Sequence, residues 1–207
     1  LAELTKDMDV VIHLAAITDA VTSFGRSEEI EQVNHVGTIL VAEACIETGA
    51  KLLFPSTTSV YGFQSEVVDE TCPVEKLKPQ SPYSDYKLKT EQVLQEMNEK
   101  GDLKFIIGRL GTIFGASIGM RFHTAVNKFC WQASMGQPLT VWKTAMDQKR
   151  PYLGVNDAFR AIKFIIKKDL NKFINDLIEE RIIQDFDFKK LSIDYSSKSK
   201  QGDISTN

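Results

Sequence analysis

Residues 54–62 read Phe-Pro-Ser-Thr-Thr-Ser-Val-Tyr-Gly, and residues 81–87 read Ser-Pro-Tyr-Ser-Asp-Tyr-Lys. The first stretch has an apolar start and then a run of hydroxyl residues, which is typical of a buried strand that opens into a turn. The second begins with Ser-Pro, which fits a helix N-cap and first helical position, and predicts a helix that ends near Lys100. Tyr83 and Lys87 are four residues apart, so they project from one helical face. A hydroxyl, a phenol and an ammonium held together have the chemistry of a proton-transfer site.

Apolar runs before and after this stretch predict a parallel sheet. Residues 10–16 form an apolar run without alternation, which is typical of a strand buried on both faces. Residues 52–54 and 105–107 predict two further short strands. Between the first two strands, residues 28–48 have helical spacing, and Gly49 stands where a helix-ending glycine belongs. Strand, helix and strand form a βαβ unit, so we expect parallel strands joined by right-handed crossovers.

The spacing of apolar residues changes in the second half of the chain. We expect helices at 123–134 and 155–168 and a strand at 139–142, from their apolar spacing. Residues 62–80 contain two prolines and an acidic cluster, which indicates a surface loop. The tail from residue 192 is rich in Ser and Lys, so we expect it to be poorly ordered.

Composition indicates a globular protein and argues against several other classes. The 207 residues are 43% hydrophobic and 26% charged, with a net charge of -3, so neither nucleic acid nor an anionic membrane is an expected partner. No apolar run reaches the roughly 18 residues of a membrane helix, and we find no signal-peptide pattern. The three cysteines are far apart and the three histidines do not cluster, so we place no metal and expect a reduced, cytoplasmic setting.

The spacing of Tyr83 and Lys87 carries little weight by itself. With 5 tyrosines and 19 lysines among 207 residues, chance alone gives about 0.5 such pairs. A structural surface pair is therefore the better interpretation of the spacing alone, and the hydroxyl run could equally be a turn. The position of the pair changes the balance, because it follows the carboxyl end of a parallel strand, where open α/β sheets bind ligands.

Six short motifs occur in a fixed order along the chain. They are the strand at 9–16, Asn34 with Gly37 and Thr38, the stretch 54–62, the segment 82–87 with Glu91, the segment 109–115, and Arg150 followed by Asp157. This ordered set resembles the extended short-chain dehydrogenases/reductases, also called NAD-dependent epimerases/dehydratases, over residues 9 to about 162. The resemblance implies an α/β fold, a Rossmann-like doubly wound parallel sheet with a smaller C-terminal substrate lobe. Residues 1–115 would be a partial NAD(P)-binding domain with the Tyr/Lys helix, and residues 116–207 mainly a substrate-binding lobe with some segments that return to the Rossmann domain.

The resemblance also implies roles for particular residues. Tyr83 matches the catalytic acid/base, Lys87 the lysine that bonds the nicotinamide ribose and lowers the pKa of the tyrosine, and Thr57 the catalytic Ser/Thr. The implied cofactor-binding residues are Ala15, Ala16, Asn34, Ser56, Tyr83, Lys87 and Leu110. The implied substrate-binding residues are Thr57, Thr58, Thr112, Asn127 and Arg150. Arg150 matches an arginine that often pairs with the substrate diphosphate, with a surface salt bridge as the alternative, and Asn127 could equally be a helix-surface amide.

The chain departs from the family pattern at three places. The glycine-rich phosphate loop is absent, so we expect that about 60 residues, equal to two βαβ-sized units, are missing before Leu1. After Leu170, a helical pattern stands where the family has a strand with small residues. Thr112 occupies the position of the family's substrate-contacting asparagine.

The preferred hypothesis is an NAD-dependent epimerase of a nucleotide-diphosphate sugar, with NADP not excluded. A 4,6-dehydratase is less favoured, because that branch resembles Thr-Asp-Glu where this chain has Thr57, Thr58 and Ser59. A reductase and a non-catalytic NAD(P)-binding protein stay open as alternatives. A homodimer through the Tyr-bearing helix is compatible with the stripe of Tyr86, Val93 and Met97, although burial inside one domain explains that stripe equally.

Overall fold

Two units make up the chain, Leu1–Leu110 and Gly111–Asn207, and each is described by itself. The computed structural model describes residues 1–19, 22–64, 67–101, 103–143, 149–167 and 203–206. Within these residues, no helix has the length and apolar character needed to cross a membrane.

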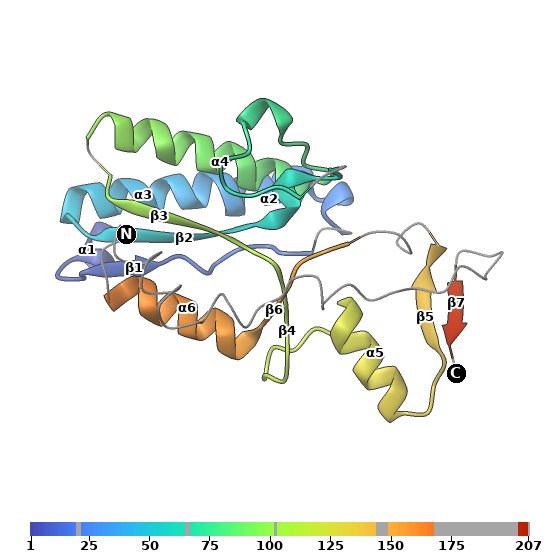
Figure 1. Ribbon diagram of the computed structural model, residues 1–207. Coiled ribbons are helices and arrows are strands. Elements are labelled where there is room, and N and C mark those ends of the chain that lie inside the picture. The colour runs from blue at the N-terminus through green and yellow to red at the C-terminus, as the bar shows by residue number, and fades with distance from the viewer. Residues whose placement is uncertain (20–21, 65–66, 102, 144–148, 168–202, 207) are drawn as a thin grey trace. The chain divides into compact units, whose positions relative to one another are not determined.

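The first unit is built on a three-stranded parallel sheet in the order β1-β2-β3 (Figure 1). Its strands are β1 (Val10–Ile12), β2 (Lys51–Thr57) and β3 (Phe105–Leu110). Parallel pairing confirms the predicted βαβ unit. The expectation that the first strand is buried on both faces was wrong, because Ile12 is 37% exposed and Leu14 is 65% exposed. The reason is that β1 is an edge strand of this sheet and ends earlier than predicted.

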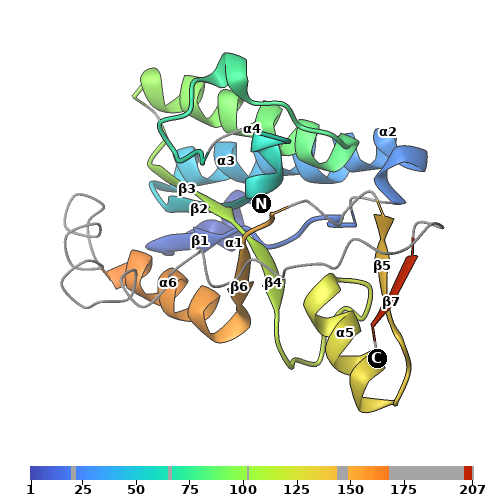
Figure 2. The same ribbon diagram turned by 45° about the vertical axis from the view of Figure 1, so that its right-hand side comes forward.

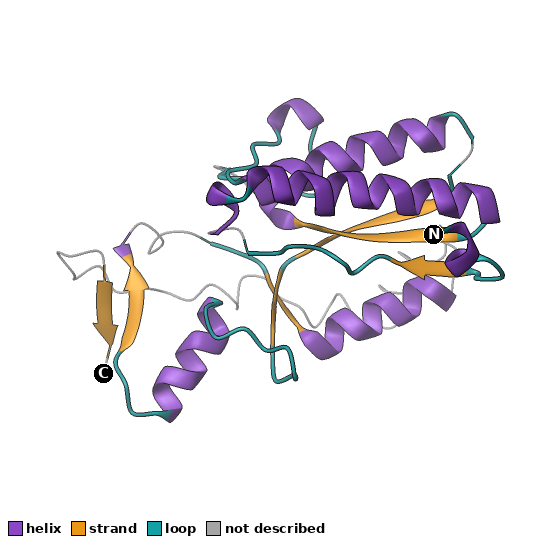
Figure 3. Ribbon diagram, turned by 180° about the vertical axis from the view of Figure 1, so that it is seen from behind, coloured by secondary structure: helices purple, strands orange, loops and turns teal. Residues whose placement is uncertain are grey.

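Two long helices of the first unit, α3 (Gly37–Thr48) and α4 (Pro82–Glu99), lie on the same face of the sheet (Figures 1 and 3). Apolar side chains from the strands and both helices are buried between them, namely Leu52, Phe54, Ala42, Cys45 and Leu94. The short helix α1 (Ala2–Thr5) packs on α3, where the Thr5 hydroxyl donates to the carbonyl of Ala44 at 3.3 Å. The core therefore fixes α4 against β2, the strand that precedes the hydroxyl run.

The helix predicted over 28–48 is not one regular helix. It is divided into α2 (Ser27–Ile30), a π-helical segment η2 (Glu31–Val36) and α3. Gly49 ends α3 with a φ of 76°, as predicted for a helix-ending glycine. A π-helical turn is wider than an α-helical one and is frequent at functional sites.

The start of α4 follows the sequence prediction closely. Ser81 is the N-cap, Pro82 is the first helical residue, and the side chains of Ser81 and Ser84 form a reciprocal capping box. Short 3-10 turns occur at several places before α4 in the chain. They are η1 (Thr22–Gly25), η3 (Thr58–Tyr61) and η4 (Val74–Lys76). Capping satisfies the first backbone N–H groups, so the helix begins at a fixed residue and places Tyr83 in its first turn.

Gly62 closes η3 at a point where two backbone segments meet. Its φ of 65° and ψ of -149° fall in a region that only glycine populates readily. A Cβ at this position would lie 2.0 Å from the carbonyl oxygen of Lys78.

We expect Gly62→Ala to lower the free energy of unfolding of the full chain by about 2 to 4 kcal/mol, because the strained backbone and the clash add. Urea unfolding measures this change. Gly101→Ala is the matched control, since Gly101 also has a positive φ (82°) but a Cβ there would meet nothing within 4 Å. Equal losses in the two variants would show that the contact with Lys78 does not matter.

The described residues of the second unit form short strands and helices, some of which Figure 2 labels. Its elements are β4 (Thr112–Phe114), α5 (Ala125–Ser134), β5 (Leu139–Trp142), β6 (Tyr152–Gly154), α6 (Val155–Lys167) and β7 (Asp203–Thr206). The strands β4 and β6 pair in parallel, β5 and β7 pair antiparallel, and α5 packs beside β5. The tail expected to be poorly ordered therefore includes a four-residue strand, while residues 192–202, residue 207 and the end of the helix predicted to residue 168 lie outside the described residues.

Candidate active site

The site begins where β2 continues past the end of β1. Pairing of β1 with β2 ends at Ile12 and Leu53, whereas β2 stays paired with β3 as far as Thr57 and Leu110. Pro55 has no N–H to donate, and it is tolerated here because it lies beyond the paired length of β1. Among the described residues, the last residues of β2 therefore have no paired strand on the β1 side, and we call this the open end of β2, at the carboxyl ends of the strands.

Thr57 ends β2 and caps η3. The backbone N–H of Ser59 donates to the Thr57 hydroxyl oxygen at 3.1 Å, so the hydroxyl run does form the local turn that was the alternative interpretation. Accepting this bond uses one lone pair of Oγ1 and leaves the hydroxyl proton for a donated bond. Thr57 is buried at 9% exposure, and Thr58, the first residue of η3, is half-buried.

Lys87 is a buried ammonium on the face of α4 that packs on β2. Its side chain is 4% exposed, and Nζ donates to the carbonyl oxygen of Pro55 at 2.8 Å and lies 4.3 Å from the centre of the Phe54 ring. Burial lowers the pKa of Lys87 from 10.5 to about 8, against the opposing effect of the Glu91 charge. An ammonium has three protons, so the bond to Pro55 leaves donors for other groups.

Tyr83 lies one turn before Lys87 on the same helix and is half-buried. The side chains at positions 83, 87 and 91 recur every four residues, so they share one face of α4. A positive charge one turn away favours the phenolate form of a tyrosine, which is what an acid/base at neutral pH requires.

Glu91 continues this face and forms the densest set of polar contacts at the site. Its carboxylate is 2% exposed and accepts two charge-assisted bonds from Arg109, at 3.0 Å from Nε and 2.6 Å from Nη2. It also accepts the Ser56 hydroxyl. Burial opposes the charge of Arg109, but hydrogen bonds to Glu91 and Tyr61 outweigh it and raise the pKa of the guanidinium. The predicted cofactor residue Ser56 is thus engaged by a carboxylate within the protein.

His13 follows β1 and is held in one tautomer. The hydroxyl of Thr38 donates to the carbonyl of Asn34 at 2.6 Å, so toward His13 Nε2, 3.1 Å away, Thr38 Oγ1 acts as an acceptor. Burial, and secondly the charge of Lys87, lower the pKa of His13. The lowered pKa favours the neutral imidazole of His13, with its proton on Nε2 and donated to Thr38.

The loop after β1 is fixed by Asn34. The side-chain amide of Asn34 is 1% exposed and bonds both the N–H and the carbonyl of Ile17, each at 2.7 Å. Ala15 and Ala16 lie between this clamp and His13, whose N–H donates to Leu53 at 3.0 Å. Asn34 thus fixes the predicted cofactor loop with its side chain. Ala15 is exposed, Ala16 and Leu110 are half-buried, and their cofactor roles stay predictions.

The remaining predicted substrate residues belong to the second unit. Thr112 is half-buried in β4, and its N–H donates to the carbonyl of Pro151 at 2.9 Å. Asn127 is buried, and its amide bonds the N–H of Gly115 at 3.0 Å and the carbonyl of Arg121 at 3.1 Å, so it is not the helix-surface amide of the alternative. Arg150 is exposed just before β6. Their substrate roles stay predictions.

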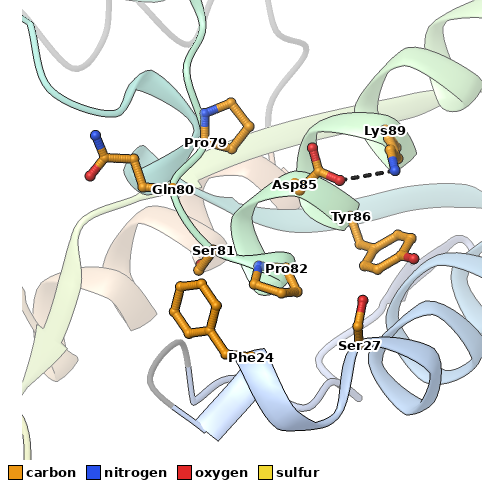
Figure 4. Close-up of a pocket in the computed structure, with 9 residues that line it drawn as sticks. All are labelled: Phe24, Ser27, Pro79, Gln80, Ser81, Pro82, Asp85, Tyr86 and Lys89. Carbon is orange, nitrogen blue, oxygen red and sulfur yellow. Dashed lines mark ion pairs between the residues drawn. The ribbon is translucent and has the colours of Figure 1, made fainter.

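A hollow of about 430 Å³ lies at the start of α4 (Figure 4), and neither Tyr83 nor Lys87 lines it. It is lined by Phe24, Ser27, Pro79, Gln80, Ser81, Pro82, Asp85, Tyr86 and Lys89. Its charged side chains, Asp85 and Lys89, form an exposed ion pair at 2.9 Å with each other. We assign it no catalytic role, because its charged groups are paired and in solvent.

Two elements of the site were missed in the sequence. The ion pair of Glu91 and Arg109 joins residues that both stood in the motif set, but no role was predicted for either. A signal was present, because an acid four residues after Lys87 falls on a face that also carries apolar Leu94. The tautomer of His13 depends on contacts between β1 and α3, which no local pattern contains.

The parallel sheet, the open end of β2 and the helix with Tyr83 and Lys87 define a Rossmann-like protein of the short-chain dehydrogenase/reductase class. The NAD dependent epimerase/dehydratase family matches residues 1–175, and the chain belongs to that family. The resemblance predicted from six motifs and the predicted fold class are therefore confirmed.

Three similar proteins are between 27% and 30% identical to the chain over the aligned residues. An uncharacterized UDP-glucose epimerase, YtcB of Bacillus subtilis, is 27% identical over 96% of this chain and 65% of its own length. A trifunctional UDP-glucose 4,6-dehydratase, epimerase and reductase of Arabidopsis thaliana is 30% identical over 80% of this chain and 25% of its own length. The UDP-glucuronic acid 4-epimerase of Bacillus cereus, solved with UDP-glucuronic acid and NAD, is 29% identical with a TM-score of 0.72, over 82% of this chain and 53% of that one. The chain thus spans less than two thirds of these proteins.

Proposed function

We propose that the chain carries the catalytic part of an NAD-dependent nucleotide-sugar epimerase. The observation that carries this proposal is the buried ammonium of Lys87, one turn after Tyr83 and beside the open carboxyl end of β2. Burying a lysine ammonium is costly, so its position calls for a function that needs the charge there. Membership of the epimerase/dehydratase family supports the same conclusion.

The residues of the first unit fit the nicotinamide end of NAD, with NADP as the alternative. Lys87 retains ammonium protons for ribose hydroxyls, and Ala15 and Ala16 leave the backbone after β1 accessible. NAD bound there would supply the hydride acceptor and donor for the substrate carbon. The structure neighbours solved with NAD are consistent with this assignment.

Tyr83 performs the proton transfer in this proposal. As phenolate it takes the proton of a sugar hydroxyl, and it returns the proton when the hydroxyl is formed again. The Thr57 hydroxyl donates to the same sugar oxygen and stabilises the charge that develops there. Lys87 favours the phenolate and orients the ribose. For a C4 epimerase, the keto sugar turns between the two halves of the reaction.

The substrate in this proposal is a nucleotide-diphosphate sugar, as in the Bacillus cereus epimerase solved with UDP-glucuronic acid. Residues 116–207 would supply most of the substrate lobe, with Arg150 on the diphosphate and Thr58, Thr112 and Asn127 near the sugar. The guanidinium of Arg150 suits a diphosphate because it presents a planar set of donors.

Positions 58 and 59 favour an epimerase over a 4,6-dehydratase. Elimination of water needs an acid and a base in addition to the tyrosine, and η3 begins with Thr58 and Ser59, which carry no carboxylate. A reductase would use the same three residues and stays an alternative. A protein that binds NAD(P) without turnover gives no reason for Thr57, Tyr83 and Lys87 together.

Proton NMR of the full chain with NAD and a panel of UDP- and dTDP-sugars in D₂O tests the proposal. We expect the C4 epimer to form with its C4 hydrogen retained from the substrate. A 4-keto-6-deoxy product would show a dehydratase, and consumption of NADH or NADPH with a keto sugar would show a reductase. Tight NAD binding with no change in any sugar would overturn the proposal in favour of a binding protein.

The predicted dimer stripe on α4 is partly explained within the first unit. Met97 packs against the buried core, and the Tyr86 hydroxyl donates to Glu31 at 3.0 Å. Val33 and Leu40, on the neighbouring segments η2 and α3, are apolar residues with exposures of 40% and 48%. The homodimer and the cytoplasmic location both stay predictions.

A further inference from the structure

Glu91 is buried and charged, yet the proton-transfer chemistry leaves it without a role. One carboxylate oxygen, Oε1, accepts the Ser56 hydroxyl and lies 3.3 Å from Nε of Arg109. The other, Oε2, accepts Nε and Nη2 of Arg109 at 3.0 and 2.6 Å. Its exposure is 2%, so the carboxylate faces protein groups on both oxygens. A carboxylate held in this way is poorly placed to exchange a proton with a substrate.

The bonds of Glu91 join the elements that carry the three catalytic side chains. Glu91 is on α4, one turn after Lys87, while Ser56 is on β2 directly before Thr57. Arg109 is on β3, in register with Ser56. The guanidinium of Arg109 also lies 4.9 Å from the centre of the Tyr61 ring, at the end of the turn that Thr57 caps. One buried ion pair thus touches α4, β2, β3 and η3.

We propose that Glu91 and Arg109 are a positioning pair, which fixes the Tyr83 and Lys87 face of α4 against the ends of β2 and β3 so that both side chains keep one geometry relative to Thr57. This inference rests on the proposed function, and it assigns a role in that reaction to two residues that do not touch the substrate. Bidentate bonds between a carboxylate and a guanidinium are strongly directional, so the pair defines an orientation as well as a distance.

The pair also has an electrostatic consequence for Lys87. The groups that face the ammonium are Glu91 on α4, His13 after β1, the Phe54 ring and the Pro55 carbonyl on β2, with Tyr83 one turn away on α4. Burial lowers the pKa of Lys87 and the charge of Glu91 raises it, whereas His13 is neutral. The charge of Glu91 therefore favours the protonated form of Lys87.

Glu91→Gln in the full chain tests the proposal, because the amide keeps the shape and removes the charge. Turnover in the sugar assay is expected to fall about 10- to 100-fold, with KM for the nucleotide sugar within about threefold, since the change acts on alignment rather than on substrate binding. NMR titration of lysines labelled with ¹³C at Cε, with the Lys87 signal assigned from Lys87→Met, is expected to show the pKa of Lys87 about one pH unit lower than in the native chain.

Asp85→Asn is the matched control. Asp85 is on the same helix, its side chain is 45% exposed, and its ion-pair partner is Lys89. Turnover and the Lys87 titration of this variant are therefore expected to stay native. Thermal unfolding reports whether each variant is folded. If Glu91→Gln does not fold, Ser56→Ala keeps the ion pair and removes only the bond to β2, and a fall of about tenfold in turnover is expected for it.

A native pKa of Lys87 and native turnover in folded Glu91→Gln would overturn the inference while leaving the proposed function intact. Absence of epimerase turnover in the native chain would instead contradict the proposed function. In that case the titration of Lys87 still tests the electrostatic part of the pair, because it needs neither substrate nor cofactor.

Discussion

Tyr83→Phe in the full chain is expected to lower the turnover of nucleotide sugars by about 10² to 10⁴-fold, because it removes the proton acceptor and keeps the ring. Tyr83 is half-buried in the first turn of α4, so the ring continues to fill its place and the fold is expected to stay native. Binding of the nucleotide sugar is expected to change little, since the phenol acts in the transition state. Single-turnover kinetics with the epimerase substrate measures the step directly.

Tyr86→Phe is the control for this experiment. Tyr86 is on the same helix, but it projects from the adjacent face and its hydroxyl donates to Glu31 at 3.0 Å. We expect near-native turnover and a small loss of stability, about 1 kcal/mol, from the lost hydrogen bond. Turnover of Tyr83→Phe within a few-fold of the Tyr86→Phe value would exclude Tyr83 as the acid/base.

The predicted elements that proved correct are those defined by local rules. The capping box of α4 and the glycine that ends α3 could be predicted because capping depends on residues within one turn of the helix end. The π-helical segment 31–36 could not, because it has apolar spacing close to that of an α-helix. Within this segment, the side chain of Asn34 bonds the backbone of Ile17, which is 17 residues away in the sequence. A local pattern does not contain such a contact. The strands β4 and β6 have three residues each, too few to show a period.

The same distinction between local motifs and long-range packing applies to the residues of the candidate site. Thr57, Tyr83 and Lys87 were predicted because each stands in a short motif at a strand end or a helix start. Glu91 and Arg109 were visible as residues of those motifs, but their pairing depends on the packing of α4 over β2 and β3. The family resemblance also predicted that Ser56 binds the cofactor. In the structure the Ser56 hydroxyl donates to Glu91.

Lys87→Met is expected to separate activity from stability. Turnover is expected to fall about 100-fold or more, since the group that favours the phenolate is lost. Stability should not fall with it. The pKa of Lys87 is lowered to about 8, and the difference from 10.5 corresponds to a cost of about 3 kcal/mol for the charged form in the folded protein at neutral pH. The methionine removes this cost, but it also loses the hydrogen bond to Pro55, which offsets about 1 to 2 kcal/mol of the gain in stability. At pH 7 we therefore expect a free energy of unfolding that is unchanged or about 1 to 2 kcal/mol higher.

The pH dependence of unfolding gives this prediction its sign. Below pH 8, Lys87 is protonated in both the folded and the unfolded state, so the full cost of burying the charge is present. Between about pH 8 and pH 10.5 the unfolded state binds more protons, so this group makes the native chain more stable as the pH rises. In Lys87→Met that rise is expected to be absent. Urea unfolding at pH 7, 8, 9 and 10 measures both curves, with Lys89→Met as the control, because Lys89 is 52% exposed. A loss of several kcal/mol in Lys87→Met at pH 7 would mean that the ammonium stabilises the fold, and that its burial is not a cost borne for function.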